Sequence, residues 1–192
     1  NPDKPTIEHP TAAEELNYLI HTGILEVDET FNPDAPVTKE EALKVLLKSV
    51  TYAYYYGYDE SETTNQSFTD ITPDHTLYPF VTRALKMGMI DASNKTFNAT
   101  ASLSNQELAK WLIGALKLNK AAQYSDIYQL NYNDGTQVDK DLRGYVALAY
   151  EMELLEAENN QLKPKDEITY AQLAQVIIRL AHKMNEYQID NY

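Results

Sequence analysis

The fold of this chain is decided by the stretch Val37-Thr38-Lys39-Glu40-Glu41-Ala42, which carries the start signal of a helix. Thr38 can accept a hydrogen bond from a free backbone N–H of the first turn, and Glu41 can reach back to the backbone amide of Thr38. The apolar first and last residues of the stretch flank the cap and fix the direction of the entering chain. The stretch therefore predicts a capping box and a helix that begins at Lys39.

The same signal recurs twice more, at intervals of 66 and 65 residues. The other copies are Leu103-Ser104-Asn105-Gln106-Glu107-Leu108 and Ile168-Thr169-Tyr170-Ala171-Gln172-Leu173. A second marker begins seven residues before each cap, as Phe31-Asn32-Pro33, Phe97-Asn98-Ala99 and Leu162-Lys163-Pro164. Two markers that keep a constant phase three times indicate an internal repeat.

Each unit is expected to contain a short helix, a tight loop and a longer capped helix. The longer helices are predicted over residues 39 to about 56, 105 to about 118 and 170 to about 187, each with one apolar stripe at helical spacing. The three stripes are expected to bury one another in a central bundle, because a unit of this size cannot bury much core alone.

We therefore expect a single all-α domain made of three pseudo-symmetric helix-loop-helix units. The repeats are placed at residues 1–58, 68–120 and 124–187. The polar stretch 57–67 is interpreted as an exposed connector, and 129–140 as a turn or short hairpin inserted in the third unit.

The composition places the chain among globular proteins and limits its partners. It is 43% hydrophobic and 23% charged, and no apolar run approaches the roughly 20 residues that a membrane helix needs. Sixteen Lys and Arg against 29 Asp and Glu give a net charge of −13, which disfavours nucleic acid and anionic membrane as partners. The absence of cysteine excludes disulfides and thiolate zinc sites. A start without Met or signal peptide indicates an excised fragment or mature product.

The order of motifs within the units resembles the S-layer homology (SLH) repeat, which opens with Phe-Ser/Thr-Asp-Val and ends with Ile-Thr-Arg-Ala-Glu. Unit two shows Phe68-Thr69-Asp70-Ile71, then His75, a helix closing at Gly88-Met89-Ile90, and the Ser104 cap. Unit three shows the opening as Tyr124-Ser125-Asp126-Ile127. Unit one keeps Gly23-Ile24 and its capped ending.

This resemblance implies a non-covalent cell-wall attachment module of a secreted protein at the bacterial cell surface. In that family, grooves between neighbouring repeats hold secondary cell wall polysaccharide, often through its pyruvylated, anionic sugar. No cofactor, nucleic acid or membrane insertion is implied. The candidate polysaccharide contacts are Thr38, Lys39, Arg83, Lys86, Ser104, Asn105, Thr169 and Tyr170.

The chain departs from the family pattern where the chemistry would occur. The position of the family's Arg at the start of each long helix is Lys39, Asn105 or Tyr170, and the family's Trp after His75 is Thr76. Lys supplies a point charge without the planar fork of Arg. A second hypothesis is therefore a degenerate scaffold that no longer binds sugar and mediates protein–protein contact or structural spacing.

Several of these side chains have a structural interpretation beside the functional one. Glu41, Glu107 and Gln172 are expected to complete the caps, and Asp70 and Asp126 to fix the turn that enters their units. Lys39 alone, and the pair Arg83 and Lys86, are at positions where a charged side chain is more often solvated than bound to a ligand. Trp111 is interpreted as a partly buried core residue or an exposed stacking face.

Two other groups of residues were considered as sites: the role of a tyrosine cluster is left open, and a metal site formed by histidines is not expected. A tyrosine cluster at positions 52, 54, 55, 56 and 58 is either a contact surface or packs on the connector. The scattered histidines (His9, His21, His75 and His182) do not have metal-ligand spacing. No phosphate loop, nucleophile elbow or acid–base pair is evident, so we expect no enzymatic activity.

Overall fold

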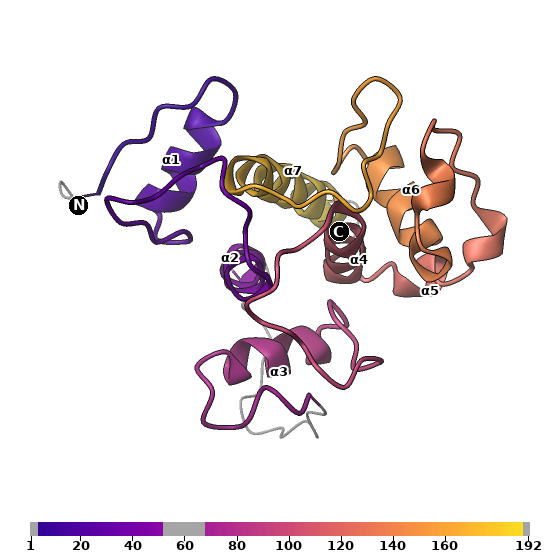
Figure 1. Cartoon of the computed structure of the whole chain (residues 1–192), viewed down its shortest axis with the longest axis horizontal. Coiled ribbons are helices and arrows are strands. Elements are labelled where there is room, and N and C mark those ends of the chain that lie inside the picture. Colours follow the sequence, from indigo (N-terminus) through magenta and orange to yellow (C-terminus); the bar gives the residue numbers. More distant parts are fainter. Residues whose placement is uncertain (1–3, 52–67, 190–192) are drawn as a thin grey trace.

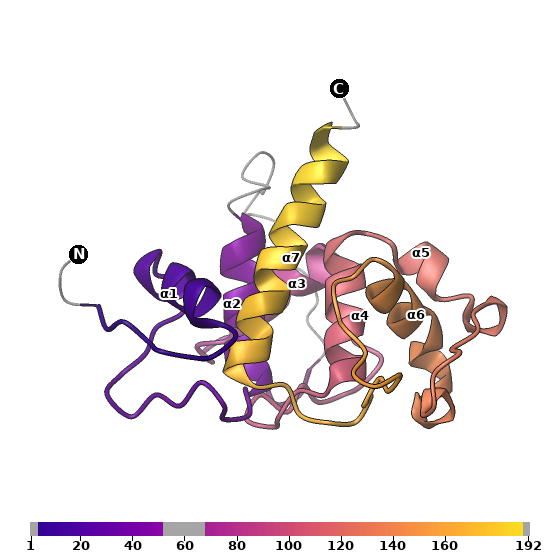
Figure 2. The same cartoon turned by 90° about the horizontal axis from the view of Figure 1, so that it is seen from above.

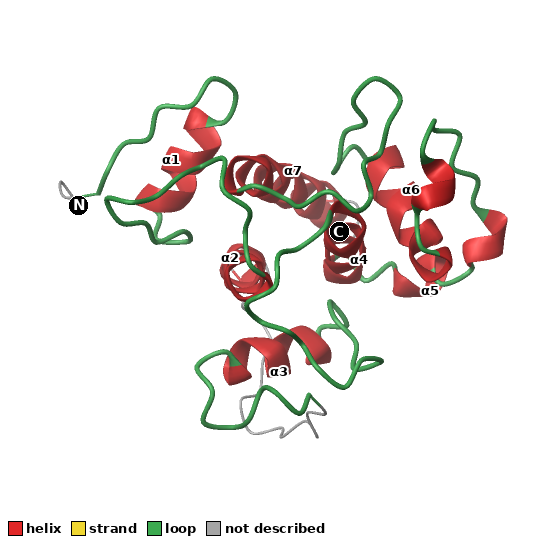
Figure 3. Ribbon diagram, in the orientation of Figure 1, coloured by secondary structure: helices red, strands yellow, loops and turns green. Residues whose placement is uncertain are grey.

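A computed structural model describes residues 4–51 and 68–189. These residues form seven α-helices and three 3-10 helices, with isolated bridges but no β-strand (Figure 3). The α-helices are α1 (Ala13–His21), α2 (Lys39–Thr51), α3 (Tyr78–Lys86), α4 (Asn105–Ala115), α5 (Asn119–Ala122), α6 (Arg143–Glu151) and α7 (Tyr170–Ile189). The 3-10 helices are η1 (Ser125–Ile127), η2 (Gly135–Gln137) and η3 (Lys140–Leu142). The predicted all-α fold is confirmed.

The three longer helices α2, α4 and α7 lie at the centre of the molecule (Figure 1). They run in the same direction, with their N-terminal ends together (Figure 2). They begin at Lys39, Asn105 and Tyr170, as the capping boxes predict. α4 ends at Ala115, earlier than expected, and the end predicted near Tyr56 lies outside the described residues, as do the tyrosine cluster and the connector 57–67.

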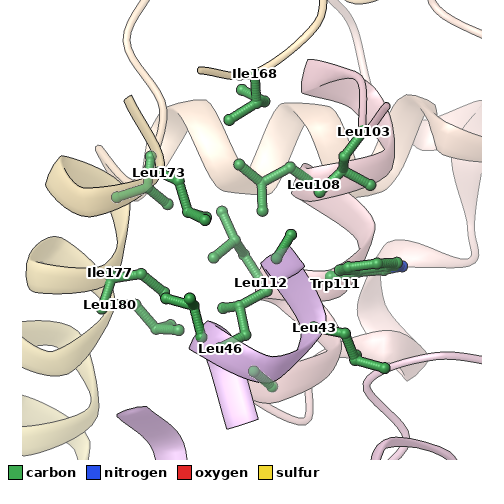
Figure 4. Close-up of a cluster of buried hydrophobic side chains, with 14 of the residues drawn as sticks. Leu43, Leu46, Leu103, Leu108, Trp111, Leu112, Ile168, Leu173, Ile177 and Leu180 are labelled. Carbon is green, nitrogen blue, oxygen red and sulfur yellow. The ribbon is translucent and has the colours of Figure 1, made fainter. Parts of the chain in front are cut away.

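The core is formed where side chains of the three long helices converge (Figure 4). Each helix contributes residues that are at most 2% exposed, and these are Leu43 and Leu46, Leu108 and Leu112, and Leu173, Ile177 and Leu180. Burial of one such side chain contributes roughly 1.5 to 3 kcal/mol. Because the buried faces belong to segments far apart in the sequence, the core forms only when all three helices associate.

The short helices pack against the long helices of neighbouring units. α3 packs against α2, α6 against α4, and α1 against α7 (Figure 1). The last of these contacts joins the two ends of the described chain and closes a ring. The interior is therefore shared around the whole molecule, which supports the prediction of one cooperative domain; the division into three repeats stays a prediction.

A ring of backbone hydrogen bonds joins the residues that precede the three caps. The Val37 amide donates to the Ile168 carbonyl (2.8 Å), Leu103 to Val37 (3.2 Å), and Ile168 to Leu103 (2.8 Å). All three side chains are at most 1% exposed. The apolar residue expected to orient each entering chain thus also satisfies its backbone groups in the closed ring.

The entry to the second and third units is held by one carboxylate each. Asp70 accepts hydrogen bonds from the amides of Phe97 and Asn98, both at 2.8 Å. In the third unit Asp134 accepts the corresponding bonds from Leu162 and Lys163, also at 2.8 Å.

Asp126, which the sequence analysis assigned to that position, instead has a side chain 85% exposed that pairs with Lys140 at 3.7 Å. We infer that the third unit opens at Tyr132-Asn133-Asp134. The stretch 129–140, expected to be an inserted turn or hairpin, contains this opening and the turn η2.

Candidate functional site

The first residue of each long helix contacts the neighbouring unit. Lys39 Nζ forms an ion pair with Glu107 Oε1 at 3.0 Å, and the two side chains are 17% and 36% exposed. The Tyr170 hydroxyl donates to Glu41, and the Asn105 side-chain amide donates to the Lys163 carbonyl at 2.8 Å. The three positions where the family carries Arg are thus engaged in contacts between units.

The cap residues hold the helix starts through hydrogen bonds within each unit. Ser104 and Glu107 form a reciprocal capping box, and Thr169 and Gln172 make the same pair of bonds. In unit one the Glu41 amide donates to Thr38 Oγ1 at 3.3 Å, while the Glu41 carboxylate accepts from the Thr38 hydroxyl. The polar groups of Thr38, Ser104 and Thr169 therefore serve the helix ends.

The next amides of each long helix are also satisfied within the protein. The first and second amides donate to carbonyls of a neighbouring unit's loop at 2.8 to 3.2 Å; the pairs are Lys39–Ala101, Glu40–Ala99, Asn105–Asp166, Gln106–Pro164, Tyr170–Ala35 and Ala171–Pro33. An anion at a helix N-terminus is ordinarily held by such amides when they are free. Here an anionic ligand would have to be held by side chains.

A groove of about 500 Å³ lies at the boundary between the second and third units, and we call it the first groove. It is lined by the loop 90–98, one face of α4, Lys39, Asp139, and Leu142, which is the last residue of η3. Gln106 places the third unit against it by exchanging two 3.0 Å hydrogen bonds with Asp139. Trp111 stacks on Phe97 in its wall but is only 7% exposed, so it is mainly a core residue.

Charges of both signs line the first groove. Lys110 pairs with Asp91, and Lys39 with Glu107. Partial burial acts to raise the pKa of the Glu107 carboxyl, but hydrogen bonds from Ser104 and Lys39 outweigh it, so that pKa is lowered. The pKa of Asp91 is lowered in the same way, since Lys110 and Ser93 outweigh its burial. Both carboxylates are therefore ionised at neutral pH.

Lys95 also lines the first groove, and it differs from Lys39 and Lys110 in its ion pairing. Its side chain is exposed in the loop that lines the groove, and across residues 4–51 and 68–189 no carboxylate forms an ion pair with it. Neither Lys95 nor Lys110 was predicted from the sequence as a contact residue. The available signal was their place in the repeat, since Lys110 lies six residues after a cap and Lys95 two residues before the Phe97 marker.

A second groove of about 330 Å³ is built in the same way from the third unit. It is lined by the loop 155–163, one face of α7, and Asn105. Gln172, Gln175 and Val176 line it, and each lies 65 residues after a lining residue of the first groove. Arg179 pairs with Glu156 at 3.0 Å, and Lys163 with Glu158, so this groove is also balanced in charge.

Two aromatic rings lie where the first unit meets the third, at the position that corresponds to these grooves. Phe31 and Tyr170 pack edge to face with centroids 5.1 Å apart. The pKa of the Tyr170 hydroxyl is raised by burial and by its hydrogen bond to Glu41. Tyr170 thus joins two units.

The remaining candidates lie away from the two grooves. Arg83 and Lys86 are on α3 and line neither groove, and both are engaged in interactions. His9 and His75 each accept a backbone N–H at the start of a short helix through Nδ1. Among the residues that the structure describes, no cluster of three or more possible metal ligands occurs.

A third cavity, which we call the side cavity, has a volume of about 500 Å³ and lies beside the first groove. It is lined by residues 123–127, which include η1, by Lys140 and Asp141 of η3, and by Tyr145 of α6. Lys110 lines both this cavity and the first groove. Neither the cavity nor a ligand-binding role for its lining residues was predicted from the sequence.

Comparison with known proteins confirms the resemblance seen in the repeats. The S-layer homology domain family matches residues 6–43 and 131–174. These segments contain the first and third capping boxes, and the second begins beside the Tyr132-Asn133-Asp134 opening. These two segments are thus similar to the S-layer homology domain. Within the part that the structure describes, no helix combines the length and apolar character needed to cross a bilayer.

Two curated relatives match most of this chain. Exoglucanase XynX of Acetivibrio thermocellus is 23% identical over 159 residues, which are 82% of this chain and 14% of that protein. Amylopullulanase of Thermoanaerobacterium thermosulfurigenes is 22% identical over 157 residues, which are 81% of this chain and 8% of that protein. The chain therefore spans a small part of each relative.

Proposed function

We propose that this chain is a non-covalent attachment module that holds a larger secreted bacterial protein at the cell surface. It does so by binding secondary cell wall polysaccharide in the grooves between units. The observation that carries the proposal is the S-layer homology match in two segments. The two grooves, whose lining residues repeat at an interval of 65, provide support because they lie at the unit boundaries where that family binds its ligand.

The relatives support an accessory role rather than a catalytic one. Both carry enzyme names, yet the matched segment is 14% of one and 8% of the other. A segment shared by an exoglucanase and an amylopullulanase fits a module that accompanies different catalytic domains. We therefore propose that the chain itself has no enzymatic activity.

The first groove is the better candidate for an anionic sugar such as a pyruvylated one. Lys39, Lys95 and Lys110 all line it. Two of these lysines already pair with carboxylates, so we assign the principal contact with a ligand carboxylate to Lys95. Ser93, Asn94 and Thr96 beside it supply the donors and acceptors that sugar hydroxyls require.

The proposal is tested by sedimentation with cell walls purified from the bacterium that produces the chain. One portion keeps its polysaccharide and a second is stripped of it by acid. The chain is expected to pellet with intact walls and to remain in the supernatant with stripped walls. Failure to pellet with intact walls would contradict the attachment function.

Three single variants locate the contact. Lys95→Ala is expected to weaken pelleting about tenfold, as loss of one charge-assisted contact predicts. Lys39→Ala is expected to weaken it as well, because Glu107 then remains in the groove without its partner. Lys120→Ala is the matched control, since Lys120 is exposed on α5 and lines none of the three cavities. Equal binding by all three variants would exclude the first groove.

The alternative, a degenerate scaffold for protein contact or spacing, is favoured by one structural observation. The amides and side chains at the start of the long helices are already bonded within the protein, as in the Lys39–Glu107 and Tyr170–Glu41 pairs. A net charge of −13 also opposes an anionic ligand at long range. A chain that fails to pellet with any wall preparation but associates with its parent protein's other domains would establish this alternative.

A further inference from the structure

The link between the second and third units builds a surface of its own. Residues 116–131 join α4 to the opening of the third unit, and α5 and η1 within this link pack against α6 (Figure 1). The link thereby covers part of α6 and leaves the side cavity between η1 and η3.

Apolar side chains are exposed at the side cavity. Ile127 is 73% exposed and Tyr124 is 60% exposed, and both line the cavity. Large apolar side chains of this exposure are rare in the described part of the chain, where Tyr18 is the other example. Their burial against a ligand would remove apolar surface from water.

The polar lining of the side cavity is balanced in charge. Lys140 pairs with Asp126 at 3.7 Å, and Asp141 and Lys110 complete the charged lining. An aromatic face surrounded by side chains that donate and accept hydrogen bonds suits a sugar ring, which has an apolar face and an edge of hydroxyl groups. Balanced charge favours a neutral sugar over an anion.

Lys110 connects the side cavity to the first groove. Its ammonium group pairs with Asp91 in the first groove and lies 5.9 Å from the centre of the Tyr145 ring, which lines the side cavity. On the third unit, Asp139 lines the groove and the adjacent Lys140 lines the cavity. The two hollows are therefore neighbours along a continuous surface.

We propose that the side cavity is an additional saccharide subsite that binds the sugars next to those held in the first groove, on the same polysaccharide chain. Tyr124 supplies the stacking face, and Lys140 and Asp141 contact the sugar hydroxyls. This inference rests on the proposed attachment function. A polymer offers consecutive sugars, so two adjoining cavities of about 500 Å³ each can be filled by one ligand.

The test measures how affinity depends on ligand length. Wall polysaccharide is released by acid, cut by partial hydrolysis and separated by size, and each fraction is titrated into the chain by calorimetry. Tyr124→Ala is expected to weaken binding of the longest fragments about three- to tenfold, the range expected from loss of one aromatic contact, and to leave the shortest binding fragments unchanged. Tyr124→Phe, which keeps the ring, is expected to bind like the unaltered chain.

Two controls separate this subsite from the first groove. Tyr18→Ala removes an exposed tyrosine that lines none of the three cavities and is expected to leave all affinities unchanged. Lys95→Ala is expected to weaken binding of short and long fragments alike. If Tyr124→Ala binds long fragments normally, or weakens short and long fragments equally, the subsite is wrong while attachment stands. If the unaltered chain binds no fragment, both proposals fail.

Discussion

Asp134 shows how one carboxylate can hold the entry to a whole unit. It is 7% exposed, and its two oxygens accept the amides of Leu162 and Lys163. Asp70 makes the same two bonds in the second unit but is more exposed. The cost of losing such bonds depends on whether water can replace the missing acceptor.

We expect Asp134→Ala to lower the free energy of unfolding by about 2 to 4 kcal/mol, because two amides lose their charged acceptor. Asp70→Ala is expected to cost about 1 to 2 kcal/mol, since water can reach its amides. Asp126→Ala is expected to change stability by less than about 0.5 kcal/mol, as for an exposed charge. Urea unfolding followed by circular dichroism ranks the three variants. A larger loss of stability for Asp126→Ala than for Asp134→Ala would show that the third unit opens at Asp126.

Glu107 predicts a pH dependence of stability. Its pKa is lower in the folded chain than the ordinary 4.5, so the unfolded chain takes up the proton more readily. Its contribution is therefore complete above about pH 4.5 and is lost as the pH falls through the folded pKa.

Glu107→Gln keeps the cap, as Gln172 does in the third unit, but loses the charge that pairs with Lys39. The variant is expected to be less stable by about 0.5 to 1 kcal/mol near neutral pH, with the difference shrinking as the pH falls below about 4.5. Denaturant titrations at several pH values measure this, with the exposed loop variant Glu29→Gln as control. A difference that stays constant or grows on acidification would show that the charge of Glu107 is not involved.

The long helices are alike at their starts but differ where the short helices end. The position ten residues after the cap is Lys48 in α2 and Arg179 in α7. These side chains pair with Glu26 and Glu156, which lie in the loops that follow the short helices α1 and α6. In α4 it is Gly114, and a Cβ placed there would lie 2.7 Å from the Gly88 carbonyl oxygen and 2.8 Å from Met89 Cα. α4 therefore approaches the Gly88–Met89 backbone more closely than a side chain allows.

Gly114→Ala is expected to lower the free energy of unfolding by about 1 to 3 kcal/mol, because the added methyl group meets backbone atoms that cannot turn away. Helix propensity alone predicts the opposite sign, a gain of about 1 kcal/mol for replacing Gly by Ala within a helix. The sign of the change, measured by thermal or urea unfolding, therefore decides between close packing and an ordinary helical position. Stabilisation by the variant would contradict the close approach.

The starts of the long helices could be predicted from the sequence because a capping box is a local signal. Thr38, Ser104 and Thr169 each bond within their own first turn, so no distant residue has to be known. The opening of the third unit was misplaced for the opposite reason. Tyr124-Ser125-Asp126 imitates the motif locally, whereas the bonds of Asp134 reach residues 28 and 29 positions away.

The contacts that the candidate site residues make within the protein could not be predicted either, because they join different units. The Lys39–Glu107 pair joins side chains that lie far apart in the sequence. The ring of bonds among Val37, Leu103 and Ile168 requires all three units to be in place. Repeat phase can indicate which positions are equivalent but not which neighbouring side chains meet there.

Closure of the ring by α1 and α7 predicts that the whole chain unfolds in one step. Trp111, the chain's single Trp, reports on α4 by fluorescence, whereas circular dichroism reports on all helices. Leu16→Ala removes a fully buried side chain of α1 and is expected to cost about 2 to 5 kcal/mol, lowering both urea midpoints equally. Tyr18→Ala, at an exposed position of the same helix, controls for the truncation. The contrary result would be a Leu16→Ala variant that loses part of its circular dichroism signal at a lower urea concentration while the fluorescence transition of Trp111 is unchanged. The units would then unfold separately, and the interior would not be shared around the ring.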